Sequence, residues 1–301
     1  MPRLCVGPGT PTAPSFEVPQ GACDTHLHVL GPFDRFPLAD ARPYTPPEAP
    51  LEKAIVMLDT LGIERMVVAH VSAHGMDLKA TLDALSRLGD RARGTALLEP
   101  GVSDSEIEKL HNAGMRGVRL SPAYGAQTSI NEAALRYWAE RIAPFDWHIA
   151  MWPSEVDEIA LLRRLVDELP ARLVIDHLGN AAWAPALGVS QPGFRQLIEL
   201  LRTDRVWVKL SAMYRASDAG SPWRELIPYG AALVEANPGR MLWASDWPHV
   251  GLWTVEAMPH SGDLLDWLQA IGADAAMRKR ILVDNPIELY GFAPVDIRPG
   301  T

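Results

Sequence analysis

The sequence has few cysteines and no long hydrophobic segment. Only two of its 301 residues are cysteine, Cys5 and Cys23, which cannot form a disulfide framework and favour a reducing compartment. No apolar run approaches the ~20 residues that a membrane-spanning helix needs. The N-terminal stretch is rich in Pro, Gly and Thr and lacks the basic start and apolar core of a signal peptide. These absences predict a cytoplasmic protein with no membrane partner.

An excess of positive charge is also missing. The formal net charge of −9 argues against nucleic acid or an anionic membrane surface as a partner. It still allows a small anionic substrate, because the local field of a pocket and the net charge of a protein are separate matters. With 48% hydrophobic residues, the chain can bury the core of one large α/β domain.

Short apolar segments alternate with helical patterns along the whole chain. Eight strands, each followed by a helix and near-continuously apolar, predict a parallel sheet buried on both faces. Eight such units at this length favour a (β/α)8 TIM barrel over a doubly wound open sheet, which usually has a glycine-rich loop after its first strand. We expect a single barrel domain over 21–292, between an N-terminal tail (1–20) and a C-terminal tail (293–301). The expected strands are 22–29, 65–71, 94–98, 115–120, 148–152, 172–177, 206–211 and 241–246. The expected helices are 51–61, 78–88, 104–113, 131–142, 155–169, 192–201, 228–235, 264–271, 275–282 and 286–290.

The first expected strand contains two histidines, His26 and His28, one residue apart. Side chains alternate along a strand, so both imidazoles point to the same face. With Asp24 beside them, they suit either a metal site or a polar catalytic pocket. A pair of hydrogen-bonded structural histidines is the alternative for an isolated His-x-His.

Further polar residues follow the other expected strands. In a TIM barrel the working groups lie at the C-terminal ends of the strands, where they converge. Histidines without a shared role would instead be scattered over the helices. The convergence therefore favours a functional His26 and His28. The residues at these ends are His26 and His28, Ser72 and His74, Arg119, His177, Ser211 to Arg215, and Asp246 with His249.

Three of these strand ends resemble the amidohydrolase superfamily. The motifs are the His-x-His pair, Ile175-Asp176-His177-Leu178-Gly179, and Ser245-Asp246-Trp247-Pro248-His249. Together with the stretches 31–37, 114–119 and 284–286, they resemble most its branch of lactone hydrolases, which includes the 2-pyrone-4,6-dicarboxylate lactonases. The resemblance extends over about 21–292. It implies a hydrolase that opens a lactone ring.

The same resemblance implies roles for four residues. Asp246 matches the general base that activates water, and His26, His28 and His177 match the imidazoles around the substrate carbonyl. A two-metal centre would need a lysine ending the fourth strand and a histidine ending the fifth, where this chain has Arg119 and Trp152. A single zinc held by the three histidines and Asp246 is one alternative. The other alternative is that the protein requires no cofactor, and the lactonase resemblance slightly favours it.

The arginines predict the substrate class. Arg119 and Arg215 follow the fourth and seventh strands, and planar guanidinium groups suit carboxylates. We expect them to hold an anionic group of the lactone, with Ser72 and His74 as secondary substrate contacts. The alternative for the arginines is an ion pair with loop carboxylates.

Two positions depart from the dicarboxylate lactonases. Trp152 and Asn180 stand where that branch has a tyrosine and an arginine, and we expect both to contact substrate. The loss of an arginine makes a muconolactone with a carboxylate or sulfonate, or a sugar-acid lactone, as credible as the pyrone dicarboxylate. A lactone isomerase and a zinc-dependent decarboxylase are the alternative functions. We expect a role in aromatic or sugar-acid catabolism, in a monomer or small homo-oligomer.

Overall fold

Eight parallel strands lie in chain order around a barrel. The structure is a computed structural model and describes residues 2–122, 128–180 and 185–295. Each strand is paired in parallel with the next, from β1 to β8, and the predicted TIM barrel is confirmed. The strands are β1 (Cys23–Leu27), β2 (Arg65–Ala69), β3 (Ala92–Ala96), β4 (Met115–Arg119), β5 (His148–Met151), β6 (Arg172–Ile175), β7 (Val206–Leu210) and β8 (Met241–Trp243).

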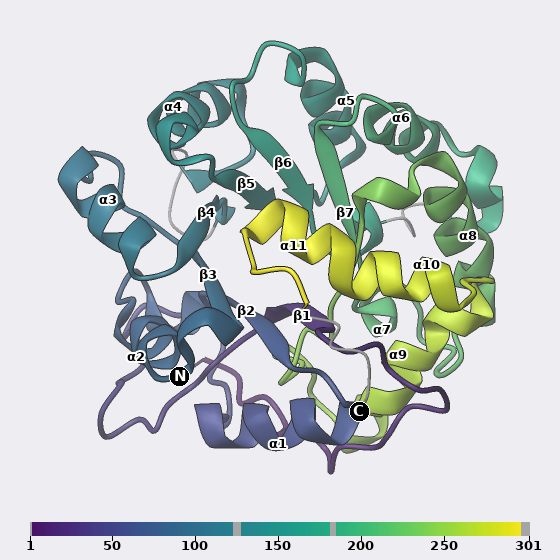
Figure 1. Ribbon diagram of the computed structural model, residues 1–301, viewed down its shortest axis with the longest axis horizontal. Helices are drawn as coiled ribbons and strands as arrows, with labels where there is room; N and C mark the ends of the chain where they lie inside the picture. The colour runs from purple at the N-terminus through teal and green to yellow at the C-terminus, as the bar shows by residue number, and fades with distance from the viewer. Residues whose placement is uncertain (1, 123–127, 181–184, 296–301) are drawn as a thin grey trace.

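The helices form an outer layer around the strands (Figure 1). Their apolar faces pack on the barrel in one continuous core, which includes Trp138, Phe194, Leu233 and Trp267. The helices are α1 (Leu51–Leu61), α2 (Lys79–Leu88), α3 (Asp104–Asn112), α4 (Glu132–Ile142), α5 (Val156–Leu165), α6 (Pro192–Leu201), α7 (Met213–Ala216), α8 (Ile227–Ala236), α9 (Ser261–Ala270), α10 (Ala275–Lys279) and α11 (Asn285–Tyr290).

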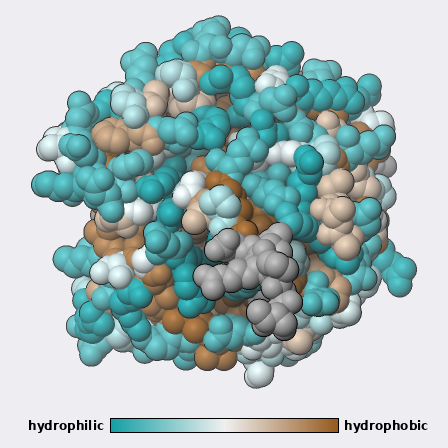
Figure 2. Space-filling model, viewed as in Figure 1, coloured by the Kyte–Doolittle hydropathy of each residue, from teal (hydrophilic) through white to brown (hydrophobic). Residues whose placement is uncertain are grey.

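The C-terminal helices close one end of the barrel. In Figure 1, α11 crosses in front of the ring of strands. Tyr290 and Phe292 pack with Cys23 and Trp207 in a small apolar cluster at this end. The surface of this face is largely hydrophilic, with smaller hydrophobic areas (Figure 2). The barrel is therefore plugged at the N-terminal ends of its strands, and the opposite end is left for a site.

The strands end earlier than the sequence predicts. β1 ends at Leu27 and β8 at Trp243, so His28 and Asp246 lie in the loops just beyond them. The third strand covers 92–96 instead of 94–98. The seventh strand ends at Leu210 instead of residue 211, and the polar stretch 211–215 at its end contains most of the short helix α7, which the sequence analysis did not predict.

The N-terminal segment 2–20 runs along the barrel without a helix or a strand of its own. It contacts two loops near the C-terminal ends of the strands: Cys5 N donates to Thr45 O at 2.9 Å, and Val6 N donates to Leu252 O at 3.1 Å. At the other terminus, residues 296–301 of the expected tail lie outside the described residues. Among the helices that the structure describes, none is long and apolar enough to span a membrane.

The interior of the barrel leaves no space for a side chain at Gly117 on β4. A Cβ there would lie 2.6 Å from Nε2 of His148, a fully buried residue on the neighbouring β5. We expect Gly117→Ala to destabilise the fold by about 1–3 kcal/mol, because the core would be overpacked. Urea unfolding gives the measurement.

Gly7→Ala is the matched control, since its Cβ would meet nothing closer than 3.8 Å. Adding His148→Ala to Gly117→Ala should recover part of the loss, as a double-mutant cycle would show. Equal stability of the two alanine variants would contradict the steric explanation.

Candidate active site

The junction between β1 and β8 brings the candidate base to the His-x-His pair. Beyond the strands, Asp246 N donates to His26 O at 2.9 Å, and His28 N donates to Trp247 O at 2.8 Å. The imidazoles of His26, in β1, and His28, just beyond it, face Asp246 together, and both are buried. Two backbone hydrogen bonds therefore place Asp246 directly beside both imidazoles.

Three imidazoles converge on one oxygen of Asp246. Oδ1 lies 3.7 Å from Nε2 of His26, 3.5 Å from Nε2 of His28 and 3.8 Å from Nε2 of His177. His177 and Asp246 both have positive φ angles, 57° and 60°. Such backbone costs roughly 1–3 kcal/mol per residue and is concentrated at functional sites. The structure thus brings together the four residues predicted to carry the chemistry.

The second oxygen of Asp246 is held by α7. Tyr214 Oη donates to Oδ2 at 2.6 Å, and Arg215 Nε donates to the same atom at 2.9 Å. His249 lies behind them, with Nδ1 3.3 Å from Tyr214 Oη. Burial alone would raise the pKa of Asp246, but Arg215, His177 and a hydrogen bond from His28 outweigh it and hold the pKa well below its usual range. The carboxylate is ionised and fixed, with Oδ1 turned to the imidazoles.

Other groups fix the outer nitrogens of the histidines. Nδ1 of His28 donates to the carbonyl of Ala69 at 2.7 Å, and Nδ1 of His177 lies 2.9 Å from Ser211 Oγ. Burial lowers the pKa of His177 to about 4, although the negative charge of Asp246 favours the protonated ring. It is therefore a neutral imidazole near pH 7.

Around His26 lies a buried ion pair that the sequence analysis did not identify. Lys209 on β7 contacts Asp176 Oδ1 at 2.9 Å and His26 Nδ1 at 3.1 Å, and Asp176 Oδ1 lies 3.3 Å from His26 Nδ1. Burial would raise the pKa of Asp176, but Lys209 and His26 hold it well below its usual range. A lysine in an apolar strand is the signal that could have found this pair, because an unpaired charge there is costly.

The donor atoms could hold one metal ion. One ligand atom each from His26, His28 and Asp246 lie within 4.8 Å of one another, and so do those of His26, Asp176 and His177. Imidazole and carboxylate are ligand types that suit a divalent ion such as zinc. The residues present therefore fit a single ion by type and proximity.

The predicted arginines lie at the edge of this cluster. Arg215 is bound to Asp246 and donates to Val250 O at 2.7 Å, which matches the ion-pair alternative. Arg119 donates to His70 O at 2.5 Å, and its Nη2 lies 4.0 Å from Asp176. Both side chains remain about one fifth exposed, at 18% and 21%. Each guanidinium can therefore still meet a ligand.

The four secondary candidates differ in their surroundings. Trp152 is 42% exposed and presents its edge to His177, 5.3 Å between ring centroids. Ser72 hydrogen-bonds to Tyr44, a residue that the sequence analysis did not identify. Burial raises the pKa of Tyr44, and the charges of Arg119, Arg215 and Asp246 also act on it. His74 Nδ1 lies 3.1 Å from Pro37 O. Asn180 ends the turn after β6 with φ 54°.

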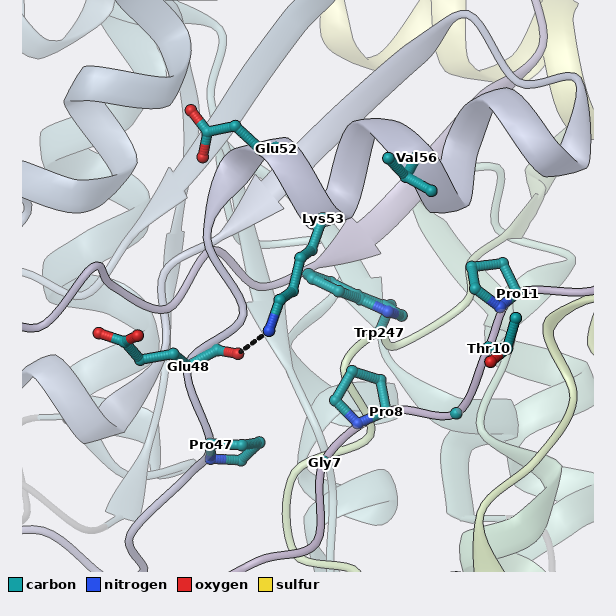
Figure 3. Close-up of a pocket in the computed structure, with 11 residues that line it drawn as sticks. Gly7, Pro8, Thr10, Pro11, Pro47, Glu48, Glu52, Lys53, Val56 and Trp247 are labelled. Atoms are coloured by element: carbon teal, nitrogen blue, oxygen red, sulfur yellow. Dashed lines mark hydrogen bonds between the residues drawn. The ribbon is translucent and has the colours of Figure 1, made fainter.

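A cavity lies behind the Asp246 loop, apart from the converging imidazoles. Trp247 faces a cavity of about 440 Å³ between the N-terminal segment, Pro47 and the start of α1 (Figure 3). Its described lining includes Lys53, which donates to the carbonyl of Glu48 at 3.3 Å, and none of the converging imidazoles. This cavity is separate from the candidate active site.

The fold and the site together define a TIM-barrel protein of the amidohydrolase type. The sequence model of the amidohydrolase family matches residues 23–292, and the chain belongs to that family. It is 40% identical over 292 residues to a 4-sulfomuconolactone hydrolase of Rhizobium radiobacter, covering 95% of this chain and 96% of that protein. It is 35% identical over 289 residues to a 2-pyrone-4,6-dicarboxylate hydrolase of Comamonas testosteroni, covering 93% of each. A crystal structure from Agrobacterium tumefaciens, without bound ligand, superposes with a TM-score of 0.81 at 26% identity, over 94% of this chain and 100% of that one.

Tyr214 is expected to tune Asp246. Tyr214→Phe removes a hydrogen bond to a charged group, a loss of about 1.5–3 kcal/mol to the ionised form. The pKa of Asp246 should rise, since the protonated form does not depend on that donor. The carboxyl carbon resonance of Asp246, followed by NMR, should titrate at higher pH in the variant than in the wild type.

Tyr229→Phe is the control, because Tyr229 is also buried but accepts its hydrogen bond from Gln191. A titration of Asp246 that is unchanged in Tyr214→Phe would show that Tyr214 does not contribute to this pKa.

Proposed function

We propose that this chain hydrolyses the ring ester of a small lactone that bears a carboxylate or sulfonate. The observation that carries the proposal is the divided environment of Asp246: Oδ2 is anchored by Tyr214 and Arg215, while Oδ1 faces three imidazoles. The two related hydrolases, named for a sulfonated muconolactone and a pyrone dicarboxylate, support the substrate class. A role in cytoplasmic catabolism of aromatic or sugar acids belongs to the same proposal.

In this mechanism Asp246 is the general base. Oδ1 accepts a proton from a water molecule, whose oxygen adds to the lactone carbonyl carbon. Imidazole N–H groups stabilise the oxyanion that forms on the carbonyl oxygen. The ring C–O bond then breaks, and the proton held by Asp246 returns to the ring oxygen, which becomes a hydroxyl group. The product is an open hydroxy acid or its keto tautomer.

We propose that the reaction does not require a metal. His26, His28 and Asp246 would hold a divalent ion if one were bound, and it would polarise the carbonyl. Two buried cations already serve these ligands, however: Arg215 contacts Asp246 Oδ2 at 2.8 Å, and Lys209 contacts His26. A further cation between them would be opposed by their charge.

The experiment that tests the function is a screen for proton release with a pH indicator. The panel contains sulfonated and carboxylated muconolactones, 2-pyrone-4,6-dicarboxylate, sugar-acid lactones and matched neutral lactones, each with and without chelator. We expect hydrolysis of acidic lactones only, unchanged by chelator. NMR of the products separates an opened acid from an isomerised lactone. A rate restored only by zinc would contradict metal independence.

Asp246→Asn should abolish turnover while substrate still binds. The amide cannot accept the water proton, so kcat should fall by about 10²–10⁴-fold. Isothermal titration with the best substrate of the screen measures the binding that remains. Asp263→Asn, on the outer helix α9, is a matched control. Near-normal kcat in Asp246→Asn would remove Asp246 from the role of base.

Arg119 is expected to bind the anionic group. Arg119→Met should raise KM for acidic lactones about 10- to 100-fold with little change in kcat, because a charge-assisted hydrogen bond is lost in both ground and transition states. Arg215→Met should lower kcat as well, because Arg215 also anchors Asp246. Arg116→Met, on the same strand as Arg119 but bound to the carbonyls of His111 and Met115, is the control. An equal rise in KM for neutral lactones would contradict recognition of the anion.

A further inference from the structure

A lysine that does not take part in the proposed chemistry lies directly behind it. Lys209 is 1% exposed, and its Nζ contacts Asp176 at 2.9 Å and His26 Nδ1 at 3.1 Å. The three residues come from β7, the end of β6 and β1. They form a triangle in which each side chain touches the other two, on the side of His26 away from Asp246.

The chemistry of the three groups limits where the proton of His26 can lie. An ammonium group only donates hydrogen bonds, and a carboxylate only accepts them. If Nδ1 of His26 accepts from Lys209, the ring proton is on Nε2; if Nδ1 donates to Asp176, Nε2 has a lone pair. Lys209 and Asp176 thus favour opposite tautomers of the same ring.

Two observations favour the proton on Nε2. The contact to Lys209 is the shorter of the two, 3.1 Å against 3.3 Å. On the other side, Nε2 of His26 has no hydrogen-bond partner among the described residues and faces the ionised Asp246 Oδ1 at 3.7 Å. His28 is held by a different kind of partner, because its Nδ1 donates to the backbone carbonyl of Ala69.

We propose that Lys209 is a positioning residue that holds His26 in its Nε2–H tautomer, so that His26 donates a hydrogen bond to the substrate carbonyl and does not ligate a metal. The hydrogen bond to the substrate carbonyl rests on the proposed function, whereas the tautomer of His26 does not. Without Lys209, Nδ1 of His26 would carry the ring proton and donate it in a hydrogen bond to Asp176. Nε2 of His26 would then offer a lone pair next to His28 and Asp246, and these three residues could together hold a metal ion such as zinc.

The test compares two variants that break the same ion pair. Lys209→Met leaves Asp176 as the partner of His26, whereas Asp176→Asn leaves the lysine as donor. In chelator-treated protein we expect Lys209→Met to bind zinc about 10- to 100-fold more tightly than the wild type, measured by competition with a chromophoric chelator. Asp176→Asn should stay within about threefold of the wild type. Equal gains in both variants, or none in Lys209→Met, would overturn the proposal.

NMR of the wild type gives a second readout that does not depend on the fold of any variant. With ¹⁵N-labelled histidine, the ring resonances of His26, assigned by their loss in His26→Gln, should show the proton on Nε2. A proton on Nδ1 in the wild type would overturn the proposal by itself. Neither readout uses a substrate, so a failed lactone screen would reject the proposed function without deciding the role of Lys209.

Discussion

The active site depends on how the barrel closes between its first and last strands. The closing contacts are backbone and side-chain hydrogen bonds: Thr25 Oγ1 donates to Trp243 O at 2.8 Å, and Ser245 N donates to Asp24 Oδ1 at 3.1 Å. Because side chains alternate along a strand, a slip of one residue would turn His26 of β1 away from Asp246. The register of this single junction therefore sets the distances on which the proposed chemistry depends.

Closure also buries charge, which must be compensated. Asp246 is paired with Arg215 and Asp176 with Lys209, one acid and one base in each pair. Removing one partner of a buried pair leaves an uncompensated charge and typically costs about 3–5 kcal/mol. Asp24 is treated differently: burial raises its pKa to about 6, although Ser245 donates to it. The interior thus holds the pKa of a carboxyl group below its usual range where a cationic side chain contacts it, as for Asp246 and Asp176.

Periodicity was sufficient to predict the barrel, because eight apolar segments with helices between them have few other solutions. It also predicted that the polar residues at the strand ends lie near one another, since parallel strands bring those ends together, but their proposed roles came from the resemblance to the amidohydrolases. Tyr214 lies in the polar stretch 211–215 named in the sequence analysis, but its contact with Asp246 was not predicted, because α7 covers only Met213–Ala216 and is too short to show a helical period. Tyr44 was not predicted because a proline-rich loop has no periodicity, and because its contact with Ser72 joins loops that are far apart in the chain. Such contacts are set by tertiary packing and not by local pattern.

The two histidines of the His-x-His pair look equivalent in the sequence, but the fold makes them chemically different. His28 meets a backbone carbonyl, a partner that any residue at position 69 supplies. His26 meets two side chains from β7 and the end of β6, and these can change in evolution without a change in the motif. Whether such a pair binds a metal or donates hydrogen bonds is therefore determined by the residues behind the imidazoles. The motif alone specifies where the rings lie, and the neighbouring strands specify what they can do.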